Sequence, residues 1–213
     1  MDMLAKFLTD YPLKEYKKGQ VILCQDTTPK YCYVVSSGFV KAYTITASGD
    51  EKPIHFDGTY DIFPIAWAFG KAQTAEYYHQ AYTDCQIYRV PREDFARFIR
   101  EHPKLLHRFF NYLLDLCWGY QAHVTSLEQA KASDKIIYTL HYLTRRFGRK
   151  VARSRVRMLL PLTQQDLANF VGLTRETTGT QLKQLEKAGI IHYYQQRYIV
   201  YVDRLRALLD RPH

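Results

Sequence analysis

The pattern of apolar residues changes near Pro91 in this chain of 213 residues. Before that point, from about residue 14 to 92, short runs rich in β-branched and aromatic residues alternate with glycines, as in QVILC, YCYVVSSGFVKAYTIT, KPIHF and CQIYRV. Strands spaced this closely, without helical segments between them, are typical of a β-barrel or jelly roll. After Pro91 the apolar residues recur with helical spacing. We therefore predict an α+β chain with an N-terminal jelly-roll β-barrel.

A long helix is predicted from Lys104 to about Lys131, after a short helix in PREDFARFIREHP. Apolar side chains recur along it in alternating steps of four and three, which is the seam of a coiled coil. The seam residues are Leu106, Phe110, Leu113, Cys117, Tyr120, Val124 and Leu127. A helix packed only against its own domain has a 3.6-residue stripe, which differs little over this length. We favour self-association and expect a homodimer.

The net charge of +9 lies entirely in the last third of the chain. Residues 145–213 contain 14 Lys and Arg against 5 Asp and Glu, whereas residues 1–144 contain 16 of each kind. A solvated basic face is the alternative interpretation. An asymmetry this complete favours a module that binds a polyanion, joined to a neutral module.

The segment LTQQDLANFVGLTRETTGTQLKQLEKAGII has the pattern of two short helices joined by a tight turn. Thr163 and Asp166 form a variant of the capping box at the start of the first helix. Small Ala168 lets the helices approach, and Gly172 permits the turn between them. Thr174 caps the second helix. A basic link, RKVARSRVR, precedes the segment, and two short strands follow it, so we predict a winged helix-turn-helix.

The second helix begins with side chains that suit the major groove of DNA. Arginine pairs with guanine through two hydrogen bonds, glutamate accepts from cytosine N4, and threonine contacts phosphate or the thymine methyl group. The candidate DNA contacts are Thr163, Gln164, Gln165, Thr174, Arg175, Glu176, Thr177, Thr180, Lys183 and Arg197, the last in the wing. The alternative for Arg175 and Glu176 is an exposed ion pair with each other.

These features resemble the Crp/Fnr family of transcriptional regulators. The helix-turn-helix segment resembles the family's winged helix, and Gly19-Gln20, YVVSSGFVKAY and SGDE resemble its cyclic-nucleotide-binding-like barrel. The resemblance implies a barrel at 1–103, a dimerisation helix at 104–132 and a winged helix at 133–213. It also implies a dimer on palindromic double-stranded DNA, controlled by a small-molecule effector in the barrel, with RNA polymerase as a further candidate partner.

The sequence departs from the family pattern inside the second helix. The resemblance makes Arg175 and Glu176 readers of bases, but Thr180 stands where many members have a second base-reading arginine. Thr178 and Gln181 are polar where aliphatic residues are common. We therefore expect a related palindrome with one fewer guanine contact.

The barrel lacks the groups with which family members bind cyclic nucleotides. After Tyr60 the chain has Asp61-Ile62-Phe63 in place of Gly-Glu, and no arginine lies between Phe56 and Gln86. Glu76 stands in this stretch, and its carboxylate would repel a phosphate. We expect an effector other than cyclic AMP.

Aromatic residues are frequent in the same stretch. Because some branches of the family sense halogenated aromatics, an aromatic or apolar effector is one interpretation, and packing of the barrel core is the other. The candidate effector residues are Tyr60, Phe63, Trp67, Tyr77, Tyr78, Cys117 and Tyr120.

No cofactor and no metal site is expected. The four cysteines, Cys24, Cys32, Cys85 and Cys117, show no C-x-x-C spacing, so reduced thiols are favoured over an iron–sulfur cluster or a redox pair. Haem stays open as an alternative, since His55, His79 and Cys117 are potential axial ligands.

Other functional classes find little support. No nucleophile–base pair, metal quartet or phosphate-binding loop indicates an enzyme. No apolar run approaches 18 residues and the N-terminus carries acids without a long apolar block, so we expect a cytoplasmic protein without a membrane span. A sensor or scaffold whose winged helix binds protein is the remaining rival, and the charge distribution argues against it.

Overall fold

The computed structural model describes residues 3–210. The chain forms two compact units, the first ending at Tyr112 and the second beginning at Leu113. The boundary lies within one continuous helix, α4 (Pro103–Glu128). This helix begins one residue earlier and ends three residues earlier than the sequence predicted.

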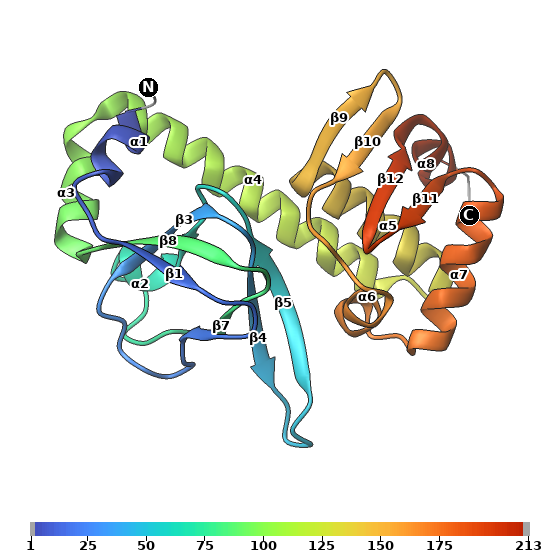
Figure 1. The fold of residues 1–213 in the computed structure, drawn as a ribbon, viewed down its shortest axis with the longest axis horizontal. Coiled ribbons are helices and arrows are strands. Elements are labelled where there is room, and N and C mark those ends of the chain that lie inside the picture. Colours follow the sequence, from blue (N-terminus) through green and yellow to red (C-terminus); the bar gives the residue numbers. More distant parts are fainter. Residues whose placement is uncertain (1–2, 211–213) are drawn as a thin grey trace. The chain divides into compact units, whose positions relative to one another are not determined.

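The first unit contains two four-stranded antiparallel sheets, as the jelly-roll prediction requires (Figure 1). The strand orders are β1-β8-β3-β6 and β2-β7-β4-β5. The elements are α1 (Met3–Leu8), β1 (Leu13–Tyr16), β2 (Val21–Leu23), β3 (Cys32–Ser37), β4 (Val40–Ile45), β5 (Glu51–Asp57), β6 (Ile62–Phe63), α2 (Ile65–Ala68), β7 (Tyr78–Ala81), β8 (Cys85–Val90) and α3 (Arg92–Glu101). The short elements α1, α2, β1, β6 and β7 were not predicted.

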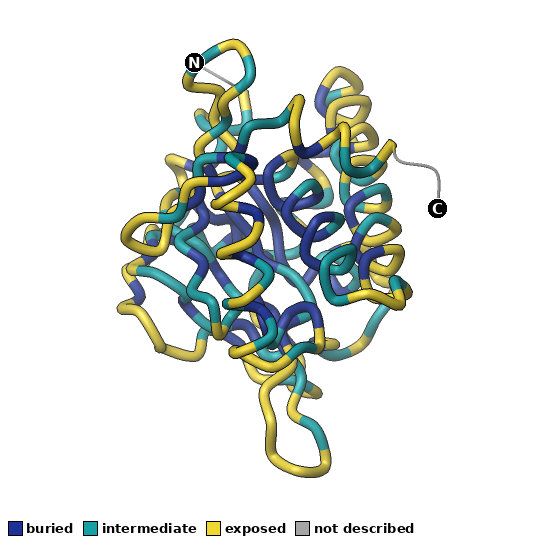
Figure 2. Tube along the Cα trace, turned by 90° about the vertical axis from the view of Figure 1, so that its right-hand side faces the viewer, coloured by how far each residue is buried: buried dark blue, intermediate teal, exposed yellow. Residues whose placement is uncertain are grey.

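The core of this unit combines aliphatic and aromatic side chains from both sheets. Val35 and Ile87 come from the first sheet and Val40 and Ala81 from the second, and all four are almost completely buried. Such burial is the main force that holds the two sheets together. In Figure 2 the helices show buried positions on one side and exposed positions on the other, and many loops are exposed.

The second unit contains helices and one four-stranded antiparallel sheet of order β11-β12-β10-β9. Its elements after α4 are α5 (Ala132–Phe147), β9 (Gly148–Ala152), β10 (Arg155–Met158), α6 (Gln164–Val171), α7 (Arg175–Lys187), β11 (Ile191–Tyr194), β12 (Arg197–Tyr201) and α8 (Val202–Leu209). The helix-turn-helix and the two strands of the wing are confirmed.

The basic stretch RKVARSRVR is a β-hairpin, not a link, and this prediction was wrong. Strands β9 and β10 pair antiparallel, and β10 continues the sheet by pairing with β12. Along β10 half-buried Val156 and buried Met158 alternate with exposed Arg155 and Arg157. The alternation expected of a strand is therefore present in β10, with arginines at the exposed positions. The stretch reads as a basic segment when its charge alone is considered.

Helix α4 buries one side in each unit. In the first unit Leu105 and Phe109 are buried. In the second unit the imidazole of His123 stacks on Phe170 at 3.9 Å between ring centroids, and Thr139 Oγ1 donates a hydrogen bond to buried Ser126 Oγ at 3.1 Å. None of the helices within residues 3–210 is long and apolar enough to cross a membrane.

Candidate nucleic-acid interface

The two caps predicted for the helix-turn-helix are confirmed. The Asp166 N–H donates to Thr163 Oγ1 at 3.0 Å, and the Thr163 N–H donates to Asp166 Oδ2 at 3.2 Å, which completes the capping box. The Thr177 N–H donates to Thr174 Oγ1 at 3.1 Å. Gly172 ends α6 in the left-handed conformation with φ of 68°, which a residue without Cβ adopts at no steric cost. These contacts fix where α7 begins.

Helix α7 has an inner and an outer face. Thr178, Leu182 and Leu185 are buried on the inner face. The outer face, together with α6, forms an open groove of about 540 Å³. Its lining residues are Gln164, Arg175, Glu176, Gly179, Thr180 and Lys183. Five of the predicted DNA contacts therefore share one surface.

The groove combines cationic and hydrogen-bonding groups. Arg175, Glu176, Thr180 and Lys183 are exposed. Within residues 3–210 no ion pair joins Arg175 to Glu176, so the structure does not show the alternative interpretation of these two residues. The first N–H groups of a helix also favour an anion.

Other predicted contacts lie outside the groove lining. Thr174 Oγ1 donates to Thr177 Oγ1 at 2.8 Å, so both hydroxyls take part in the helix cap. The exposed Gln165 amide donates to Asn169 Oδ1 at 2.8 Å. Arg197 is exposed at the start of β12, directly after a tight turn at Gln195 and Gln196 with φ of 47° and 61°.

Sequence reasoning missed a second basic surface. The β9–β10 hairpin exposes five cations: Arg149, Lys150, Arg153, Arg155 and Arg157. Alternation of arginine with apolar residues was the signal that could have identified this hairpin.

The candidate effector residues differ in their exposure. Phe63 and Trp67 are buried, Tyr77 and Tyr78 are half-buried, and Tyr60, Cys117 and Tyr120 are exposed. Phe63 stacks between Tyr33 and His79, at 5.2 and 4.6 Å between ring centroids. Tyr60 lines a pocket of about 170 Å³, whose apolar lining includes Phe95 and Phe109.

The cysteines are free thiols. Burial raises the pKa of Cys32 to about 12 and also raises the pKa of Cys85. Because the thiolate is the reactive form, these two side chains are chemically inert.

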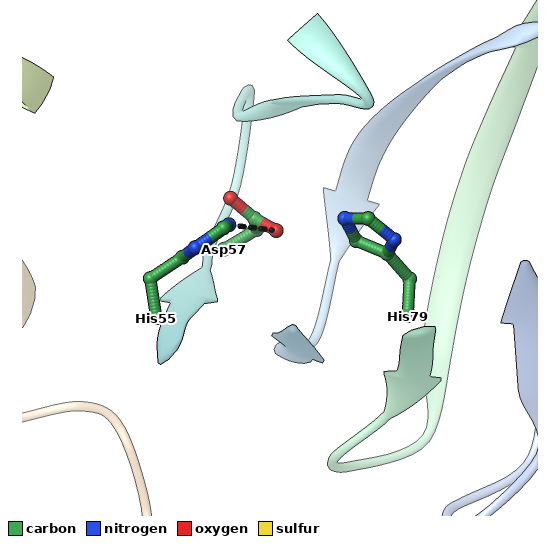
Figure 3. Close-up of side chains that lie close together, drawn as sticks. All are labelled: His55, Asp57 and His79. Carbon is green, nitrogen blue, oxygen red and sulfur yellow. Dashed lines mark ion pairs between the residues drawn. The ribbon is translucent and has the colours of Figure 1, made fainter. Parts of the chain in front are cut away.

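The barrel also contains a cluster that the sequence did not predict. Side chains of His55, Asp57 and His79 place one potential donor atom each within 4.8 Å of one another (Figure 3). The spacing His-x-Asp on a strand was the available signal, since residues two apart share a face.

Comparison with known families covers both units. The cyclic nucleotide-binding domain family matches residues 13–102, and the Crp-like helix-turn-helix domain family matches residues 134–210. The chain belongs to the Crp/Fnr family of transcriptional regulators. As a Crp/Fnr protein it is a DNA-binding regulator of transcription, and α7 is the second helix of its helix-turn-helix.

Individual Crp/Fnr relatives align along most of the chain. Electron transport regulator A of Shewanella oneidensis is 27% identical over 190 residues, which cover 89% of this chain and 74% of the relative. The fumarate and nitrate reduction regulatory protein of Escherichia coli K12 is 26% identical over 178 residues, or 84% and 70% of the two chains.

Solved structures show the same fold. FixK2 from Bradyrhizobium japonicum superposes with a TM-score of 0.77 at 22% identity, covering 95% of this chain and 98% of that one. A cyclic nucleotide-binding domain containing protein from Listeria monocytogenes gives 0.78 at 14% identity, with the same coverage.

Proposed function

We propose that this regulator is a homodimer formed along α4, and that it places one α7 in the major groove of each half of a palindromic site. The observation that carries the proposal is a second apolar stripe on α4, next to the stripe that the chain buries. Its members are Leu106, Phe110, Leu113, Cys117, Tyr120, Val124 and Leu127, of which only Leu113 is half-buried and the others are exposed.

The exposure of this stripe favours association with a second copy of the chain over packing against the chain's own residues. Phe110 and Val124 are 56% and 57% exposed, although both are strongly apolar. A contiguous apolar stripe on a soluble surface marks an interaction site. Because the steps of four and three fit a left-handed coiled coil, a second copy of α4 is the matching partner.

Each α7 would then read one half-site. Arg175 supplies two parallel donors for a guanine, and Glu176 supplies an acceptor for cytosine N4. Thr180 is too short to provide a second guanine contact of this kind. Lys183 and Gln164, which flank the groove, suit phosphates and would position α7 without reading sequence. Half-sites about 34 Å apart suit a dimer of this type.

The first unit would control the dimer through an effector other than cyclic AMP. No arginine stands between Phe56 and Gln86 to pair with a phosphate, and the buried carboxylates Asp57 and Asp61 oppose one. An effector acts by binding one arrangement of the dimer more tightly than another. RNA polymerase is the proposed partner of the DNA-bound dimer.

Regulation in this proposal uses neither haem nor an iron–sulfur cluster, and the protein acts by binding, not by catalysis. In the part of the chain that the structure describes, the one converging group of three His, Cys, Asp or Glu side chains contains no cysteine. A cluster held by cysteines therefore has no assembled ligand set there.

Two substitutions on α7 test the proposal. Arg175→Ala should reduce discrimination at one base pair per half-site by about 1–3 kcal/mol. Lys183→Ala should weaken binding to all sequences alike, and it should lower the salt-dependence slope by about 0.9 for each phosphate that the protein no longer neutralises. Binding to a library of randomised half-sites, measured at several salt concentrations, gives both quantities.

The matched control is Lys187→Ala, which removes the same charge from the last turn of α7 and outside the groove. Its effect on binding should be small. Uniform losses of equal size for Arg175→Ala and Lys183→Ala, on every sequence, would refute the assignment of Arg175 as a base reader.

A further inference from the structure

Strand register brings His55, Asp57 and His79 to one face of a sheet. Ala42 on β4 pairs with His55 on β5 and with His79 on β7, so these three residues form a row across adjacent strands. Paired residues of antiparallel strands point to the same side, and residues two apart along a strand do so as well. Asp57, two residues after His55, therefore lies on the same face of the sheet, opposite Val40.

The three side chains face one another inside the sandwich. His55 Nε2 lies 3.5 Å from Asp57 Oδ2, and one donor atom from each residue lies within 4.8 Å of the others. In Figure 3 the carboxylate of Asp57 lies between the two imidazoles, and His79 turns one ring nitrogen toward it. His79 and Asp57 are 2% and 3% exposed.

The surroundings keep this group enclosed. Ala42, the residue between the two histidines in the row, is completely buried and contributes only a methyl group. On the other side the ring of Phe63, from the opposite sheet, stacks on His79 with an interplanar angle of 11°. Phe63 therefore covers one face of the His79 ring.

The environment of His79 suits a metal ligand. The imidazole Nδ1 of His79 is buried in the core. The nearby carboxylate of Asp57 supplies the negative charge that a cation requires.

We propose that His55, Asp57 and His79 bind one divalent first-row transition-metal ion, such as Zn²⁺ or Fe²⁺, inside the barrel. Two ligands at about 2.1 Å from an ion lie at most about 4.2 Å apart. The 3.5 Å pair already meets this limit, and all the donor atoms lie within 4.8 Å of one another, close to it.

The donor set decides the class of ion. Two imidazoles and one carboxylate suit zinc, iron, cobalt and nickel, whereas Mg²⁺ and Ca²⁺ prefer oxygen ligands. Three protein ligands leave at least one coordination position for water or a small ligand. The site ties β5 to β7 across β4 within the first unit.

The test uses the untagged full chain after removal of metal with a chelator. Titration with Co²⁺, followed by visible absorption, should show saturation at one ion per chain. Zn²⁺ should displace Co²⁺, and excess Mg²⁺ or Ca²⁺ should not. Asp57→Asn, His55→Gln and His79→Gln should each weaken binding by more than about 10-fold, since even the partners of metal ligands contribute 10–100-fold.

The control is His107→Gln, which removes an exposed histidine outside the cluster and should leave binding unchanged. Imidazole ¹⁵N shifts of the wild-type protein, with and without Zn²⁺, give a readout that needs no variant. The proposal is overturned if the wild type shows no saturable site, if His107→Gln is as weak as the cluster variants, or if neither His55 nor His79 shifts at saturating Zn²⁺.

Discussion

The groove of α7 and the interior of the barrel place their charged groups in opposite environments. On α7 Arg175, Glu176 and Lys183 are all exposed. In the barrel, His79 and Asp57 are almost completely buried. Water and salt screen the first group within about 8–10 Å, so its attraction for a polyanion weakens as salt rises. In the barrel, burial instead makes an unpaired charge unfavourable. A charged His79 or Asp57 therefore needs an opposite charge close to it.

The difference shows which kind of partner each region can accept. An exposed basic groove tolerates many DNA sequences and gains specificity from a few directed contacts. A buried cluster accepts only what fits among its donor atoms.

The largest effect is expected from Val124→Glu in the exposed stripe of α4. Val124 lies outside the groove of α7, so a winged helix that bound DNA independently would keep its affinity. If the stripe forms the dimer, a buried carboxylate will disrupt it, and affinity for the palindrome will fall about 10²–10⁴-fold because the two half-sites lose their linkage. Sedimentation and titration of labelled palindrome measure both changes.

Gln121→Glu is the matched control, because Gln121 is exposed on the same helix but outside the stripe. It should preserve both the dimer and the affinity. Binding to a single half-site should be similar for Val124→Glu and the wild type. A dimeric Val124→Glu variant would argue against the stripe as the interface.

A smaller effect is expected when a glycine in each unit is replaced by alanine, because the added methyl group should lower the free energy of unfolding by different amounts. At Gly38, with φ of +85°, an added Cβ would lie 2.3 Å from the carbonyl oxygen of Asp84. Gly38→Ala should lower the free energy of unfolding by about 3 kcal/mol or more, because backbone must move as well as adopt a strained conformation. At Gly172, with φ of +68°, nothing lies within 4 Å of the added Cβ. Gly172→Ala should therefore cost only about 1 kcal/mol, from the left-handed conformation alone.

Urea unfolding measures both changes, and the two tryptophans report on the units separately, since Trp67 lies in the first and Trp118 in the second. Gly38→Ala should shift the Trp67 transition and Gly172→Ala the Trp118 transition. Equal shifts of the unfolding midpoint for the two variants would contradict the difference between the crowded surroundings of Gly38 and the open surroundings of Gly172.

The two regions also differ in how far the sequence predicts them. The helix-turn-helix depends on residues close together in the chain, such as Thr163 with Asp166 and Gly172 with its turn, so local rules locate it. The barrel cluster depends on which strands pair and in which register. His55 and His79 are separated by 24 positions, and only the pairing of both with Ala42 brings them together.

The aromatic residues of the barrel show the same limit. Their composition is compatible both with an effector pocket and with a packed core. Phe63 and Trp67 lie in the core, whereas Tyr60 is 48% exposed, and no periodicity in the sequence separates them. Whether an aromatic side chain is buried depends on which strands are neighbours in the folded sheets. The sequence alone therefore does not predict it.

The smallest effect concerns the inner face of α7, which should behave like the barrel interior. Thr178 is completely buried, and its Oγ1 has no hydrogen-bond partner. Thr178→Val keeps the shape and removes the unsatisfied hydroxyl, so the free energy of unfolding should rise by about 1 kcal/mol. The same change at exposed Thr180 should leave stability within about 0.5 kcal/mol of the wild type and alter DNA preference instead. Urea unfolding and half-site selection on the two variants separate these outcomes, and destabilisation by Thr178→Val would show that the hydroxyl is solvated in the folded protein.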